Sequence, residues 1–158
     1  FTSYLLIKYW FYNKEIINSL EENHKYIKYI IFFGVGSAIL LVLHSIFLGI
    51  KFDYDLYKIF RRVVMLAFIL FEIIAQTYLV LTLYSLKKSI TNLINPSILK
   101  LKLVLVSALI VIAIISIPIV SMPGNKMFKH ALEWNYFFGV ILFYVLTHFM
   151  WKNPSTRQ

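Results

Sequence analysis

Long apolar runs separated by short polar links dominate the pattern of hydrophobic and polar positions along the chain. A helix needs about 20 apolar residues to cross the hydrocarbon core of a bilayer, and four runs reach that length. They cover residues 29–50, 63–84, 103–122 and 132–151. Because lipid offers no partner to an unpaired backbone group, these runs predict helices. We therefore expect an all-α integral membrane bundle of four transmembrane helices, occupying residues 29–152.

The two ends of the chain depart from this pattern. Residues 1–12 are apolar and aromatic but too short to span a bilayer, so we expect the tail of an earlier span or an interfacial anchor. A polar cytosolic link follows as far as residue 28, in which Ile16, Ile17 and Leu20 share one apolar helical face. Residues 153–158 form a short polar tail.

The composition supports a membrane environment. The chain is 60% hydrophobic, 18% aromatic and only 15% charged, and its mean hydropathy is +0.76. A small soluble domain cannot hide this much apolar surface, because a large part of its surface always faces water. The absence of cysteine excludes a disulfide framework, a thiolate metal site and a thiol nucleophile.

The formal charge of +9 is spread along the ends of the apolar runs. In these positions Lys and Arg reach phosphate headgroups and set orientation, so the charge does not indicate nucleic-acid binding. The N-terminal segment, the middle link up to Lys102 and the C-terminal tail carry ten of the 16 basic residues. This bias predicts that their side of the membrane is the cytosol, or the matrix of a mitochondrion.

Glu72 is the ionisable residue predicted to lie deepest. It stands near the middle of its run, and Gln76 follows one helical turn later on the same face. A charged group at that depth costs at least about 2.5 kcal/mol unless it is paired or neutralised. We therefore expect either a functional carboxylate, such as a proton carrier or a polar contact for lipid, or a protonated carboxyl hydrogen-bonded to Gln76 or a neighbouring span.

A second polar group is predicted near one mouth of the bundle. His44 lies about two turns from the end of its run, at a depth similar to that of His130 and Glu133. Histidine and carboxylate side chains are common metal ligands, which makes these three residues weak candidates for a metal site. No second histidine and carboxylate motif accompanies them, and interfacial anchoring with local hydrogen bonds explains them better than a metal site does.

Ligation of a haem by two histidines requires both imidazoles at one depth. His44 and His148 are predicted near opposite faces, roughly 20 Å apart by helix rise, so they cannot share one haem. Glycine-rich phosphate loops, serine elbows and paired catalytic carboxylates are all lacking in the sequence. We expect no cofactor and no catalytic residue.

Small residues in the first run predict close helix packing. Gly34 and Ala38 have a spacing of four, and Ser37 lies on the same side of the helix. Such a face lets another helix approach closely. Packing inside one bundle and a dedicated dimer face both fit this pattern.

The segment KHALEWNYFFGVILFYVLTHFMWK resembles the last span of the DRAM/Frag/Sfk family of six-span eukaryotic membrane proteins. The upstream segments YLVLTLYSLKK and IKYWFYNKEIINSLEENHKYIK resemble its fourth-span exit and a cytosolic link. Glu133 and Trp134 are the positions that match the family best, whereas FEIIAQTY places an acid where small residues are usual. The resemblance implies the family's four C-terminal spans and a non-enzymatic or lipid-modifying role at endomembranes or the plasma membrane.

Two classes of function remain open. The resemblance favours a non-enzymatic protein with a lipid-related or membrane-regulatory role, whose partners are membrane lipids and other membrane helices. Small size, basic charge and an abundance of Phe and Tyr equally suit an accessory subunit of a large respiratory or other energy-converting complex, for example in the mitochondrial inner membrane. An enzyme is the least favoured class.

Overall fold

The computed structural model describes residues 1–20, 25–49, 55–87, 90, 93–121 and 126–151. Five helices account for nearly all of these residues, which confirms the all-α fold. The chain forms two compact units, Phe1–Leu79 and Val80–Gln158, and their boundary falls inside the third helix. Each unit is described by itself.

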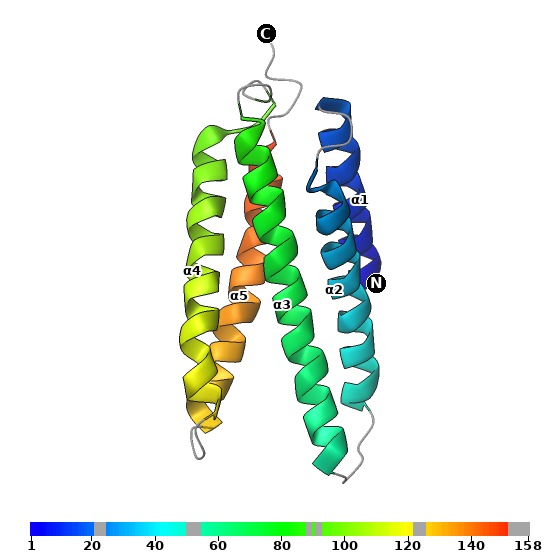
Figure 1. Cartoon of the computed structure of the whole chain (residues 1–158), viewed down its shortest axis with the longest axis vertical. Helices are drawn as coiled ribbons and strands as arrows, with labels where there is room; N and C mark the ends of the chain where they lie inside the picture. Colours follow the sequence, from blue (N-terminus) through cyan, green and yellow to red (C-terminus); the bar gives the residue numbers. More distant parts are fainter. Residues whose placement is uncertain (21–24, 50–54, 88–89, 91–92, 122–125, 152–158) are drawn as a thin grey trace. The chain divides into compact units, whose positions relative to one another are not determined.

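The first unit is built around a helical hairpin. Helix α1 (Thr2–Leu20) packs against α2 (Ile27–Gly49), and Figure 1 shows the two helices side by side and antiparallel. Trp10 of α1 is fully buried and lies over Gly34 of α2. A Cβ atom at position 34 would stand 2.4 Å from the Trp10 ring, so only glycine permits this close approach.

Helix α3 (Asp55–Ser85) joins the first unit through aromatic contacts with α2. The Phe71 ring lies 5.1 Å from that of Phe33, and a Cβ atom at Gly36 would come within 2.7 Å of it. Nearer the start of α2, Tyr78 stacks on Tyr29 with the ring centroids 5.4 Å apart. Small and aromatic residues on α2 therefore position the polar face of α3.

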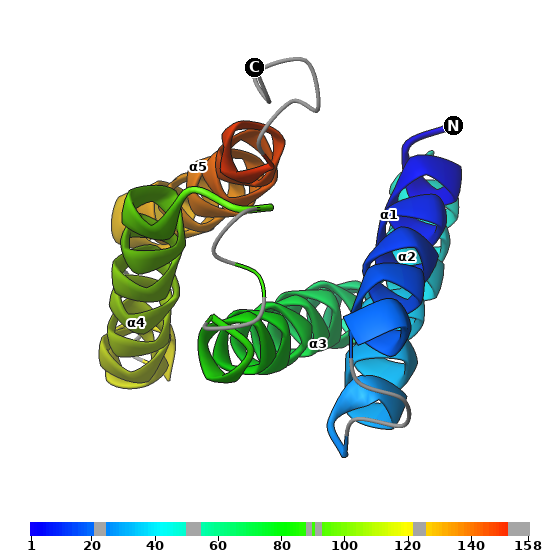
Figure 2. The ribbon, with the colours of Figure 1, turned by 90° about the horizontal axis from the view of Figure 1, so that it is seen from above.

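The second unit contains α4 (Pro96–Ser121) and α5 (Lys126–Met150), which lie side by side in Figures 1 and 2. Asn95 caps α4: its side-chain oxygen accepts a hydrogen bond of 3.0 Å from the backbone N–H of Ser97, and proline occupies the first helical position. The Asn95 backbone N–H also donates to the Met150 carbonyl at 2.8 Å, which ties the start of α4 to the end of α5.

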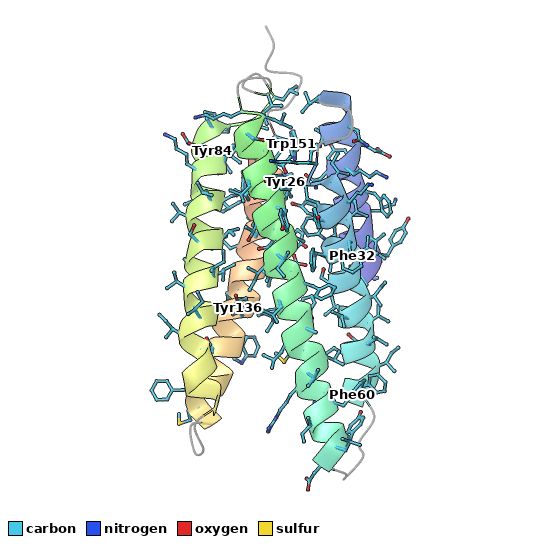
Figure 3. The ribbon with its side chains drawn as sticks, in the orientation of Figure 1. Tyr26, Phe32, Phe60, Tyr84, Tyr136 and Trp151 are labelled. Atoms are coloured by element: carbon cyan, nitrogen blue, oxygen red, sulfur yellow. The ribbon has the colours of Figure 1, made fainter. Side chains whose placement is uncertain are left out.

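Further along this pair, two contacts join the helices. The Tyr136 hydroxyl of α5 (labelled in Figure 3) donates to the Leu109 carbonyl of α4 at 2.8 Å. Gly139 receives the Leu109 side chain, which would stand 2.4 Å from a Cβ atom there. Close packing in the second unit thus also depends on one glycine.

The helices extend beyond the predicted spans. Within the described residues, three helices are long and apolar enough to cross a membrane, and the qualifying segments are Ile27–Phe47, Asp55–Ser85 and Pro96–Ser116. The run predicted as the fourth span belongs to α5, whose apolar part, Trp134–Met150, is shorter than these three. The residues before positions 63 and 103, expected as links because of their charges, are helical from Asp55 and Pro96.

The N-terminal segment forms one continuous helix. Helix α1 begins at Thr2 in the apolar segment and continues through the polar stretch to Leu20. Its buried face consists of Trp10, Asn13 and Ile17, which are spaced at three and four residues. The Asn13 amide nitrogen donates to the Tyr9 carbonyl of the same helix at 2.8 Å, whereas its buried Oδ1 has no hydrogen-bond partner among the described residues.

Candidate functional site

Two of the three residues predicted as intramembrane polar groups, Glu72 and Gln76, meet in the first unit, whereas the third, His44, is not part of their hydrogen-bonded cluster. We define the Glu72 cluster as Ser37 of α2 together with Glu72 and Gln76 of α3, all three of which are fully buried. The Gln76 amide nitrogen lies 2.8 Å from Glu72 Oε1, and Ser37 Oγ lies 2.7 Å from Glu72 Oε2. The cluster therefore links the polar face of α3 to the small-residue face of α2.

The hydrogen bonds of Ser37 bear on the charge of Glu72. Ser37 Oγ also lies 2.8 Å from the Gly34 carbonyl, but the hydroxyl has a single proton to donate. If Glu72 carries a proton, it donates to Ser37, and Ser37 donates to Gly34, so both contacts are hydrogen bonds. If Glu72 is ionised, the Ser37 proton serves only one of the two acceptors. The geometry fits a neutral carboxyl.

Of the two polar atoms in the Gln76 side chain, only the amide nitrogen makes a hydrogen bond among the described residues. Its nitrogen donates to Glu72, whereas its buried Oε1 has no hydrogen-bond partner among the described residues. A buried polar atom without a partner costs about 1–3 kcal/mol. The Glu72 cluster is therefore a buried polar site between α2 and α3 in which one acceptor, Gln76 Oε1, has no partner among the described residues.

The residues predicted to pack helices lie at helix contacts. Gly34 faces Trp10, and Ala38 is fully buried. Ser37 is more than a small residue, because it makes the hydrogen bond from α2 to Glu72 of α3. The small-residue face thus serves contacts within one unit.

The three weak metal candidates fall in different units. His44 is partly exposed on α2, whereas His130 and Glu133 belong to α5, and their side chains lie outside the described part of the structure. Among the residues described, no group of three His, Asp or Glu side chains is arranged to hold a metal ion. The convergence of these three residues at one mouth remains a prediction.

Two further residues singled out in the sequence, Trp134 and His148, lie on the exposed surface of α5. Trp134 is 60% exposed, and its ring contacts those of Phe137 and Phe138 at centroid distances of 5.9 and 6.1 Å. His148, expected as an anchor, is exposed near the end of the helix and lies 5.4 Å from the Phe149 ring. An outward-facing cluster of aromatic rings suits contact with lipid or with another helix.

Lys102 is the polar residue that sequence reasoning misplaced. It was assigned to the basic link before the third run, yet it is fully buried in α4. Its ammonium nitrogen donates to Thr147 Oγ1 of α5 and lies 3.9 Å from the centroid of the Phe143 ring. A hydrogen bond and a cation–π contact together partly offset the cost of burying the ammonium group.

The spacing of buried positions on α4 contains the signal that was missed. Leu99, Val106 and Leu109 are buried, and Lys102 stands three residues after the first and four before the second. This is the spacing of a core-facing helical stripe. Because lysine is usually exposed, Lys102 was predicted to lie in a link, although its spacing from Leu99 and Val106 is that of a buried position.

Searches of protein-family models, curated proteins and solved structures find no match to this chain.

Proposed function

We propose that this protein is embedded in a membrane and acts without catalysis, through contact with membrane lipid. The observation that carries the proposal is the distribution of side chains about the helices. Ser37, Glu72 and Gln76 are buried in the first unit, and Lys102 is buried in the second. Large apolar side chains lie outside, which suits a protein whose solvent is lipid.

The outward apolar residues occur along all of the long helices. On α2, α4 and α5 they include Phe32, Ile39, Ile46, Val104, Val111, Ile115, Phe138, Leu142 and Phe149, each at least 47% exposed. A soluble monomer rarely exposes a contiguous apolar patch of more than a few hundred square ångströms. Lipid chains are the partner that satisfies apolar faces of this length on several helices.

The buried polar groups support a structural rather than a catalytic role. The Ser37 hydroxyl of α2 is hydrogen-bonded to the Glu72 carboxyl of α3, and Lys102 of α4 donates to Thr147 of α5. Hydrogen bonds between apolar helices hold such helices together in lipid. A lipid-related, non-enzymatic role is also what the resemblance to the DRAM/Frag/Sfk family implies, with endomembranes or the plasma membrane as its place.

One observation favours the second candidate, an accessory subunit of a large membrane complex. Trp134, Phe137 and Phe138 form an exposed aromatic cluster on α5. Aromatic side chains are enriched where proteins dock, because they bury a large area with little loss of conformational freedom. The same cluster also fits the aromatic belt at a membrane surface.

Two measurements test the proposal. Membranes that contain the full chain are washed with alkaline carbonate, and the chain should stay with the membrane fraction. The protein is then extracted in mild detergent and separated by native electrophoresis, where we expect a small oligomer. Release by carbonate would overturn membrane embedding. Migration with a large complex would overturn the lipid-related role in favour of the accessory subunit.

A further inference from the structure

A basic groove lies between the end of α1 and the start of α2. Its lining consists of Lys14, Asn18, Lys25, Ile27, Lys28, Ile31 and Phe32, all in the first unit. The groove has a volume of about 740 Å³. That volume falls within the roughly 300–1,000 Å³ typical of sites for small ligands.

The charge of the groove comes from three lysines. Lys14 is partly exposed, and Lys25 and Lys28 are exposed. Their contacts within the described structure are with rings: Lys14 lies 5.7 Å from the centroid of Phe11, and Lys25 lies 4.7 Å from that of Tyr26. The described lining of the groove contains no carboxylate. The groove therefore offers ammonium groups to an anion.

The position of the groove along α2 indicates how deep its parts would lie. Lys25 and Lys28 flank Ile27, where the apolar segment Ile27–Phe47 begins. Tyr26 and Tyr29 stand at the same end, and both rings contact Tyr78 of α3. Lysine and tyrosine at the end of an apolar helix are typical of the headgroup layer of a membrane.

The floor of the groove is apolar. Ile31 and Phe32 lie about one helical turn further along α2 than Lys28, roughly 6 Å deeper at the rise of an α-helix. Figure 3 labels Phe32 on this helix and Tyr26 just before its start, and Phe32 is 64% exposed. Cations at one level and an exposed apolar surface below them match the two parts of a phospholipid.

We propose that this groove binds an anionic phospholipid, with the lysines at its phosphate and an acyl chain against Ile31 and Phe32. The inference rests on the proposed membrane function and names the class of lipid. A free phosphate would use the lysines but not the apolar floor. A zwitterionic lipid would gain less from three ammonium groups, because its own cation opposes them.

The test compares lipids at the protein surface. The full chain is reconstituted in phosphatidylcholine bilayers with a trace of spin-labelled phosphatidylglycerol or spin-labelled phosphatidylcholine, and the immobilised fraction gives the relative association constant. We expect a clear preference for phosphatidylglycerol. Each exposed lysine near an anionic headgroup is worth about fivefold in affinity, so Lys25→Gln with Lys28→Gln should reduce that preference by about 25-fold.

Matched variants separate the groove from general surface charge. Lys8→Gln with Lys100→Gln removes two exposed lysines outside the groove and should keep most of the preference. Phe32→Ala should weaken binding of phosphatidylglycerol through loss of the apolar floor. Inorganic phosphate added at millimolar concentration should not displace the labelled lipid, because it lacks an acyl chain.

Each contrary result overturns a stated part of the proposal. Equal losses in the two double variants would show surface charge without a site, and displacement by inorganic phosphate would show a simple anion site. The absence of a preference in a stably reconstituted chain would overturn the groove and leave membrane embedding intact. Failure of the chain to stay in carbonate-washed membranes would instead overturn the proposed function itself.

Discussion

Replacing Glu72 tests whether the buried carboxyl is neutral. In Glu72→Gln the new amide nitrogen can donate to Ser37 Oγ in the place of a carboxyl proton, and its oxygen can still accept from Gln76. The side chain keeps its shape and the network keeps its bonds. We therefore expect the free energy of unfolding to change by less than about 1 kcal/mol.

Glu72→Ala removes the same contacts without a substitute. Two side-chain hydrogen bonds are lost, and the buried Gln76 amide is left without the acceptor that lies 2.8 Å from it. A bond of this kind contributes roughly 0.5–1.5 kcal/mol, and an unsatisfied buried donor costs about 1–3 kcal/mol. Since such bonds contribute at the lower end of this range in lipid, we expect a loss of about 2–4 kcal/mol.

Two assays read out these variants. Unfolding in mixed micelles with increasing SDS gives the change in stability, and the infrared difference spectrum between the wild type and Glu72→Gln shows the carboxyl band. The neutral form predicts a protonated carboxyl band at neutral pH. An ionised-carboxylate band in that spectrum, or a Glu72→Gln variant as unstable as Glu72→Ala, would refute the neutral carboxyl and indicate a cation bound at the cluster.

Two further variants test the packing of each unit. Gly34→Ala should lower the free energy of unfolding by about 1–3 kcal/mol, because its Cβ atom would lie 2.4 Å from the Trp10 ring. The control Gly49→Ala should have no such effect, because a Cβ atom there meets nothing within 4 Å. Equal losses of stability in the two variants would contradict the close contact. Lys102→Met keeps the apolar stem against Phe143, so the free energy of unfolding should stay equal or rise. Lys102→Ala should lower that free energy by about 2 kcal/mol. A Lys102→Met variant as unstable as Lys102→Ala would show that the ammonium group is needed.

The apolar runs predicted helices well because their length and composition leave few alternatives. The helix ends were harder to predict, since charged residues were taken to mark the end of a helix as well as the end of its apolar part. Residues 96–102 show the difference: they contain two lysines but continue α4 from Pro96. A helix ends where its caps and turn residues are, and Asn95 with Pro96 was the better signal.

The pairing of α1 with α2 could not be predicted from the pattern of either helix. Gly34 was recognised as a site of close approach, but nothing in the sequence identified Trp10 as the residue that fills it. A glycine accepts any helix that brings a suitable side chain, so the partner is decided by the tertiary arrangement. The contact between Glu72 and Gln76 could be predicted, because both residues lie on one helix at a spacing of four.

Lys102 and Glu72 show why some buried polar residues are easier to predict from the sequence than others. Glu72 stands in the middle of an apolar run, so its neighbours mark it as buried. Lys102 stands at the edge of a run among exposed lysines, and only its three- and four-residue spacing from Leu99 and Val106 marks it. Each then bonds to a hydroxyl on another helix, Ser37 in one case and Thr147 in the other. A hydroxyl residue opposite an ionisable one is therefore the feature the two buried groups share, and it recurs in both units because an apolar surrounding leaves such a group few other partners.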